Sequence, residues 1–185
     1  MTANRTRILA LLAAILGAAA LRLVPHPPNF APIAAMALFG GAYLGRRSLA
    51  FVAPLAAMLL SDLLLGFHPY MWATYLGVAL IVLIGWAVQE RIAPVRVGVA
   101  AVASSLLFFL LTNFAVWLQS GFYPPTLAGL TACYVAAIPF FQNTLAGDLF
   151  YAALLFGGFA VMERLIPAIR EPARFVPVAT SPSVR

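Results

Sequence analysis

Four ionisable side chains lie in or beside apolar stretches of this chain, and they are the groups best suited to acid–base chemistry or to binding a charged ligand. Asp62 lies near the end of the run FVAPLAAMLLSDLLL, and Asp148 lies in a second run, TLAGDLFYAALLFGG. The two histidines, His26 and His68, each stand in a proline-containing turn next to such a run. An ionisable group inside a membrane span is costly, so it is usually paired, faces a cavity or takes part in function.

The composition indicates that these residues lie in a membrane protein. Of the 185 residues, 64% are hydrophobic and only 9% are charged, and the mean hydropathy is +1.00. A soluble domain carries about 25% charged residues, so this chain has too few to cover a water-exposed surface. Its length allows about six spans. The net charge of +6 comes from arginines without interleaved aromatic residues, so we expect no nucleic-acid partner.

Six apolar segments predict an all-α bundle of transmembrane helices surrounded by the lipid bilayer. The expected spans are 7–24, 31–45, 48–66, 70–89, 97–119 and 144–166. Prolines at 124, 125 and 139 predict a short extra helix over about 126–137 at the outer side. It is too short to span, so we expect it to be re-entrant, to lie on the surface or to act as a lid. Glycines at the end of the second span predict close helix contact. We expect residues 1–166 to form the transmembrane domain and residues 167–185 a disordered cytoplasmic tail.

The arginines predict the orientation of the spans. With the N-terminus in the cytoplasm, ten of the eleven arginines fall on the inner side and only Arg22 on the outer side. This satisfies the positive-inside rule, so we expect both termini inside and a place in a bacterial inner membrane. Polar and aromatic residues then gather at the outer face, as in a small-molecule pocket. The predicted ligand-binding residues are His26, Asn29, Asp62, His68, Tyr70, Trp72, Asn113, Trp117, Tyr123, Asn143 and Asp148.

The same residues also allow other interpretations. Asp62 would pair with Arg22, and Asp148 with a histidine or Asn113, simply to hold helices together. A membrane enzyme is a further hypothesis, but the chain has no HExxH, GxSxG or paired-carboxylate pattern, so we expect no catalysis, no metal and no cofactor. A structural or assembly protein of the cell envelope would need no small ligand at all.

The segment NFAPIAAMALFGGAYLGRRSLAFVAPLAAMLLSDLLLGFHPY resembles the first half of the substrate-binding membrane subunits of energy-coupling factor vitamin transporters. The positions that carry this resemblance are Phe30, Pro32, Phe39, Gly40, Gly45, Ser61 and Asp62. It extends over about residues 8–90 and implies uptake of a vitamin-like solute through a pocket open to the outside. Among such solutes cobalamin is the best fit, because His26, Asp62 and the aromatic residues would face a large corrin ring.

Three alanines of the first span, Ala10, Ala14 and Ala18, recur every fourth residue and share one helix face. They resemble the motif by which those subunits dock on a transmembrane coupling protein that works with ATPases, although packing inside the protein's own bundle is the alternative. The chain has no GxxxxGK[ST] motif, so ATP hydrolysis would need separate subunits. The segments TNFAVWL, YPPTLAGL and IPFFQNTLAGDLFY are similar to an uncharacterised family of bacterial inner-membrane proteins, which implies no function.

Overall fold

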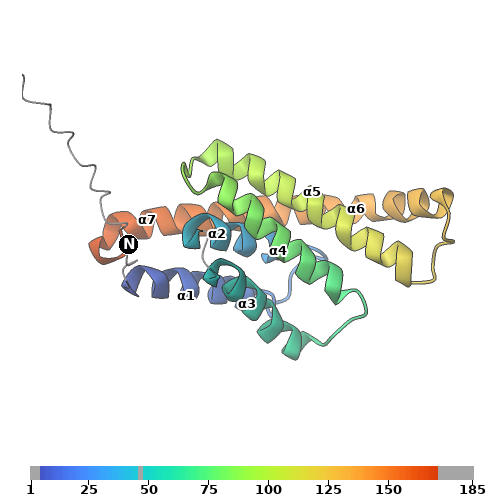
Figure 1. Cartoon of the computed structure of the whole chain (residues 1–185), viewed down its shortest axis with the longest axis horizontal. Coiled ribbons are helices and arrows are strands. Elements are labelled where there is room, and N and C mark those ends of the chain that lie inside the picture. Colours follow the sequence, from blue (N-terminus) through green and yellow to red (C-terminus); the bar gives the residue numbers. More distant parts are fainter. Residues whose placement is uncertain (1–4, 46–47, 171–185) are drawn as a thin grey trace, which may run out of the picture.

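The structure is a computed structural model that describes residues 5–45 and 48–170. Within these residues the chain is all-helical, contains no strand and forms six helices that run in alternating directions (Figure 1). The first five are α1 (Arg5–Leu21), α2 (Ile33–Leu44), α3 (Leu49–Leu65), α4 (Met71–Val88) and α5 (Pro94–Gln119). The sixth is one continuous helix made of α6 (Leu127–Ala152), the π-helical segment η1 (Ala153–Gly157) and α7 (Gly158–Leu165).

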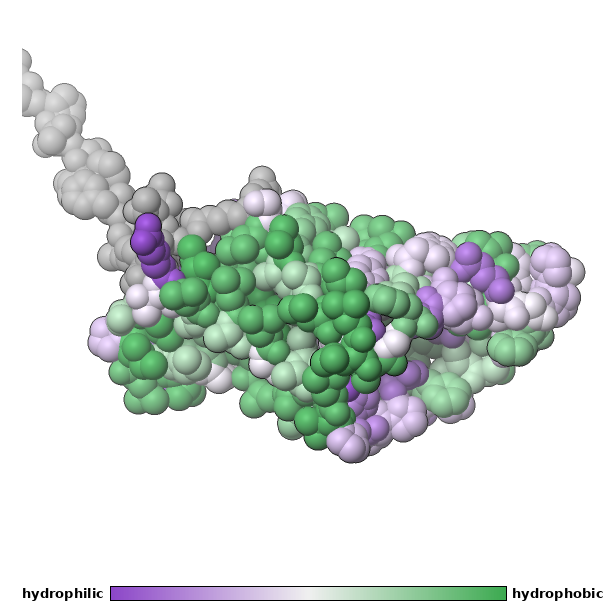
Figure 2. Space-filling model, turned by 90° about the horizontal axis from the view of Figure 1, so that it is seen from below, coloured by the Kyte–Doolittle hydropathy of each residue, from purple (hydrophilic) through white to green (hydrophobic). Residues whose placement is uncertain are grey.

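The alternating helices give the molecule two ends with different connections. We call the end that carries the start of α1 and the α4–α5 connection the terminal end (Figure 1). The opposite end, here called the loop end, carries the connections 22–32, 66–70 and 120–126. In Figure 2 most of the visible surface is hydrophobic, and hydrophilic residues gather toward the loop end. The polar connections therefore lie apart from a broad apolar belt.

The length and composition of the helices indicate a membrane protein. Among the described residues, α4, α5 and the continuous helix over 127–165 are long and apolar enough to cross a membrane, and α2 and α3 are shorter apolar helices. The continuous helix has 39 residues, so it is about 58 Å long at 1.5 Å per residue. This length exceeds the hydrocarbon core of a bilayer, which is about 30 Å thick.

The short outer helix that we expected over 126–137 does not exist as a separate element. Residues Leu127–Ala152 form one α-helix that passes through Pro139, so the sequence prediction was wrong here. The helix pairs with α5 on both sides of the proline: Tyr134 Oη donates to the Leu110 carbonyl at 2.7 Å, and the rings of Phe141 and Phe109 are 4.8 Å apart. Because packing holds both halves in place, the helix continues despite the lost backbone donor.

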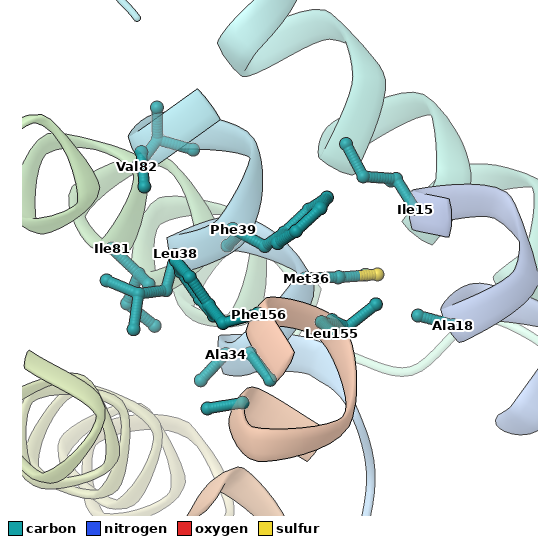
Figure 3. Close-up of a cluster of buried hydrophobic side chains, with 14 of the residues drawn as sticks. Ile15, Ala18, Ala34, Met36, Leu38, Phe39, Ile81, Val82, Leu155 and Phe156 are labelled. Carbon is teal, nitrogen blue, oxygen red and sulfur yellow. The ribbon is translucent and has the colours of Figure 1, made fainter. Parts of the chain in front are cut away.

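The centre of the bundle is α2, which buries ten of its twelve residues. Figure 3 shows its side chains meeting those of α1, α4 and η1, with Phe39 next to Phe156. Two glycines let α2 and α4 touch through their backbones. A Cβ added at Gly41 would lie 2.2 Å from the Val82 carbonyl oxygen, and one added at Gly85 would lie 2.6 Å from the Leu38 carbonyl oxygen. The predicted close contact at the end of the second span is confirmed.

The terminal end is closed by a buried arginine. Arg7 forms an ion pair with Glu163 and donates to the Ile169 carbonyl oxygen at 2.7 Å. Its guanidinium also lies 5.4 Å from the Phe159 ring and 5.7 Å from the Tyr43 ring, within the range of cation–π attraction. These contacts join α1 to α7 and to the 3₁₀ turn η2 (Pro167–Ile169).

The boundary that we expected at residue 166 falls just before this turn. Because Ile169 is buried and accepts the Arg7 hydrogen bond, the ordered chain continues past residue 166. The rest of the predicted tail, residues 171–185, lies outside the described part of the chain.

Candidate functional site at the loop end

Asp62, the first of the two membrane aspartates, is paired inside the protein. Its side chain lies near the end of α3, and the residue is only 3% exposed. Asp62 Oδ1 is 2.8 Å from Arg22 Nη2, and Tyr75 Oη donates to Oδ2 at 3.0 Å. Arg22 also donates to the hydroxyl of Ser61. The alternative in which Asp62 pairs with Arg22 is therefore confirmed, and this cluster joins the start of the connection 22–32 to α3 and α4.

Asp148, the second aspartate, has a different environment. It lies on α6 and is 2% exposed, and it accepts a hydrogen bond of 2.7 Å from the hydroxyl of Ser105 on α5. We expected a histidine or Asn113 as its partner, and that expectation was wrong. Within the described ranges Asp148 forms no ion pair, whereas Asp62 and Glu163 each have an arginine. The two buried acids therefore differ in charge balance.

The connection 22–32 lies against α6 close to Asp148. The backbone of Phe30 packs at Gly147, where an added Cβ would lie 3.1 Å from the Phe30 Cα. The Phe30 ring is 5.7 Å from that of Phe150 and 5.5 Å from that of Tyr151. One hydrogen bond of 3.0 Å, from Asn143 Nδ2 to a backbone carbonyl of the connection, ties the two segments together. The predicted site residue Asn143 thus positions this connection.

Two other predicted residues join neighbouring segments of the loop end. Trp72 Nε1, at the start of α4, donates to Gln119 Oε1 at 2.8 Å, which links α4 to the end of α5. Trp117 Nε1 donates at 3.0 Å to the carbonyl of Pro124, in the connection between α5 and α6. Trp72 is exposed and Trp117 is half-buried, and the only polar atom of each indole is directed at a protein acceptor.

The remaining predicted residues are spread over the loop end. Asn113 donates to the Phe109 carbonyl within its own helix, and its carbonyl contacts the buried Cys133 thiol. Tyr123 is half-buried in the connection 120–126. The others belong to the remaining two connections, where Tyr70 is half-buried and the rest are exposed. These are His26, Asn29, His68 and Tyr70.

The structure does not bring the histidines to the aspartates. His26 contacts the carbonyl of the next residue, Pro27, and the ring of His68 lies 6.2 Å from that of Tyr70. Neither histidine forms an ion pair with an acid in the described part of the chain. The described residues also contain no group of three or more His, Cys, Asp or Glu side chains that would hold a metal ion.

The alanine row of α1 packs against the protein's own core. Ala18 is buried, and Ala10 and Ala14 are partly buried against the same core. A partner helix would reach only the surface that this packing leaves exposed, so docking through this row stays a prediction.

Sequence reasoning missed three side chains that define these clusters. Neither Ser105 nor Tyr75 was singled out from the sequence. Arg7 was treated only as an orientation signal, although its partner Glu163 lies on the last helix. Contacts between residues far apart in sequence leave no local pattern, so none of these pairs had a signal that a single sequence provides.

Comparison with known proteins gives a family but no activity. No curated protein matches the chain, and no solved structure matches it. A family profile matches residues 2–169, which is most of the 185 residues. The chain therefore belongs to the family described as "Family of unknown function (DUF6580)".

Proposed function

We propose that this protein crosses a bacterial inner membrane six times, with both termini in the cytoplasm and the loop end outside. The arginine distribution supports this orientation. In the described part of the chain, the loop end carries one arginine, Arg22, and Asp62 neutralises it. The arginines near the terminal end are Arg5, Arg7, Arg91, Arg96, Arg164 and Arg170.

The function that we propose is binding of a small, vitamin-like solute at the loop end, as part of its uptake. The observation that carries this proposal is the way connection 22–32 lies on α6. It contains four prolines, and its residues 23–29 are exposed. The Arg22–Asp62 ion pair fixes its beginning, and the Asn143 hydrogen bond and the Phe30 ring contacts hold it on α6. A stiff, exposed segment that one hydrogen bond and ring contacts hold over a helix is suited to act as a cover that opens and closes over a binding site.

The depth of Asp148 agrees with a site in the outer half of the membrane. Asp148 precedes Glu163 by fifteen residues on one continuous helix, so it lies about 22 Å from the terminal-end ion pair. The hydrocarbon core is about 30 Å thick, so Asp148 lies nearer to the loop-end side of the membrane. A solute that enters from the loop end can therefore reach it. Uptake would also need a transmembrane coupling protein with ATPases, as the resemblance of the first half of the chain implies.

A structural or assembly role in the cell envelope is the second candidate, and one observation favours it. Asp62, the acid that carries the resemblance to the vitamin-transporter subunits, is already satisfied by Arg22 and Tyr75. Ion pairs of this kind join helices without any ligand.

A ligand screen with a location readout separates the two candidates. The purified protein is heated in detergent with a panel of vitamins that includes cobalamin, and a ligand that binds the folded state raises the unfolding temperature. Hydrogen–deuterium exchange then locates the binding site. We expect protection of connection 22–32 and of the outer halves of α5 and α6. Stabilisation by no vitamin, or protection confined to the terminal end, would favour the structural role.

A further inference from the structure

Asp148 is the one buried acid in the described chain without a cationic partner. Arg7 neutralises Glu163 and Arg22 neutralises Asp62, whereas Asp148 contacts only a hydroxyl group. A carboxylate removed from water is expensive unless a charge or several hydrogen bonds compensate it. Of the two buried acids in the described residues, Asp148 therefore lacks the counter-charge that Asp62 has.

The hydroxyl of Ser105 cannot supply this counter-charge. Ser105 Oγ lies 3.0 Å from the Ala101 carbonyl oxygen and 2.7 Å from Asp148 Oδ2. A serine hydroxyl has one hydrogen to donate, so it satisfies only one of these two acceptors at a time. The carboxyl group of Asp148 consequently has, at best, a shared donor for its two oxygens.

The aromatic rings near Asp148 favour a cation as the missing partner. Tyr151 lies three residues further along α6 and therefore on the same helix face. The Phe30 ring lies 5.5 Å from the Tyr151 ring and comes from the connection that covers α6 at Gly147. Aromatic faces attract ammonium groups, and an acid beside such rings is a usual arrangement for binding amines.

We propose that Asp148 recognises a positively charged amine or quaternary ammonium group of the solute, with the rings of Phe30 and Tyr151 beside it. This inference rests on the proposed solute-binding function and narrows its ligand to cationic compounds. Opening of connection 22–32 admits the solute, and its closure excludes water from the ion pair formed with Asp148. Opening requires the Asn143 hydrogen bond and the Phe30 ring contacts to break.

Matched pairs of probes test the charge requirement. Choline is compared with 3,3-dimethylbutan-1-ol, its neutral isostere, and pyridoxamine with pyridoxine, in which an alcohol replaces the amine. Binding to the purified full-length protein is measured by calorimetry and by thermal shift. We expect the cationic member of at least one pair to bind at least about tenfold more tightly than its neutral partner. Asp148→Asn should abolish that preference.

Two control variants identify the acid responsible. Glu90→Gln also removes one negative charge, but from an exposed position next to α4, and should leave the preference unchanged. Glu163→Gln removes a negative charge at the terminal end, about 22 Å from Asp148, and should leave the preference unchanged as well. Preference for the cation that survives Asp148→Asn would overturn the assignment of Asp148.

The outcomes also separate this inference from the proposed function. If the vitamin panel yields a neutral or anionic ligand while neither cationic probe binds, the inference fails and the solute-binding function stands. The inference also fails, and the solute-binding function stands, if the cationic and neutral members of every pair that binds have equal affinity. If neither the panel nor the probes bind, both proposals fail.

Discussion

Replacing Asp62 with asparagine tests whether the Arg22–Asp62 pair holds the loop end together. The substitution preserves the size of the side chain and an acceptor for Tyr75, and it removes only the negative charge. Arg22, whose side chain is 11% exposed, is then left without its counter-charge. The remaining contacts of its guanidinium, to Ser61 and to the sulfur of Met58, are to neutral groups.

The size of the effect follows from the burial of the pair. Removing one partner of a buried ion pair costs about 3–5 kcal/mol, because the other charge stays buried and uncompensated. Arg22 reaches the surface in part and keeps its bond to Ser61, so we expect the lower limit, about 3 kcal/mol, for Asp62→Asn. Replacing both residues, with Arg22→Gln added, should cost only about 1–2 kcal/mol, since no unpaired charge remains.

Equilibrium unfolding in mixed micelles, titrated with dodecyl sulfate and followed by circular dichroism, measures these free energies in the four proteins of the cycle. Tyr75→Phe is the matched control, and the loss of one hydroxyl donor should cost about 1 kcal/mol. The reasoning is refuted if the two single substitutions add up in the double variant, because an additive result means that the two charges do not interact.

Three further predictions concern other parts of the bundle. Gly41→Ala should lower the free energy of unfolding by about 1–3 kcal/mol, because its Cβ would lie 2.2 Å from a carbonyl oxygen of α4; Gly98→Ala, which meets nothing within 4 Å, should be neutral or stabilising in the same unfolding assay. Glu163→Gln should cost about 1–3 kcal/mol, because Arg7 loses its counter-charge, and hydrogen exchange should speed up over 163–170 but not at the loop end. Asp148→Asn should change stability by less than about 1 kcal/mol, since an amide still accepts a hydroxyl hydrogen; a loss as large as that of Asp62→Asn would contradict the difference between the two acids.

The helices were predictable because each one satisfies a local requirement that the sequence displays. An apolar run bounded by arginines, prolines or glycines predicts a span, and the first five helices begin and end within three residues of the expected bounds. The failure at Pro139 has a clear origin. A proline weakens a helix locally, but the contacts of α6 with α5 on both sides of it decide the outcome, and such contacts lie between distant parts of the chain.

The candidate site was predictable only as a set of residue types. The sequence indicated that Asp62 would pair with Arg22 or bind a ligand, and the structure selects the pair. The sequence alone offers no way to choose Ser105 as the partner of Asp148, because a serine in a long apolar helix resembles many others. The contrast between a neutralised acid and one with a shared hydroxyl depends on helix packing, so it emerges only from the assembled bundle.

Native mass spectrometry of the protein released from its own membrane is the most direct test of solute binding at the loop end. The account predicts a small molecule that stays bound to the wild type and to Glu90→Gln and is lost from Asp148→Asn while the protein remains folded. A wild-type protein that carries no small molecule would contradict solute binding. A molecule that Asp148→Asn retains would contradict the assignment of Asp148.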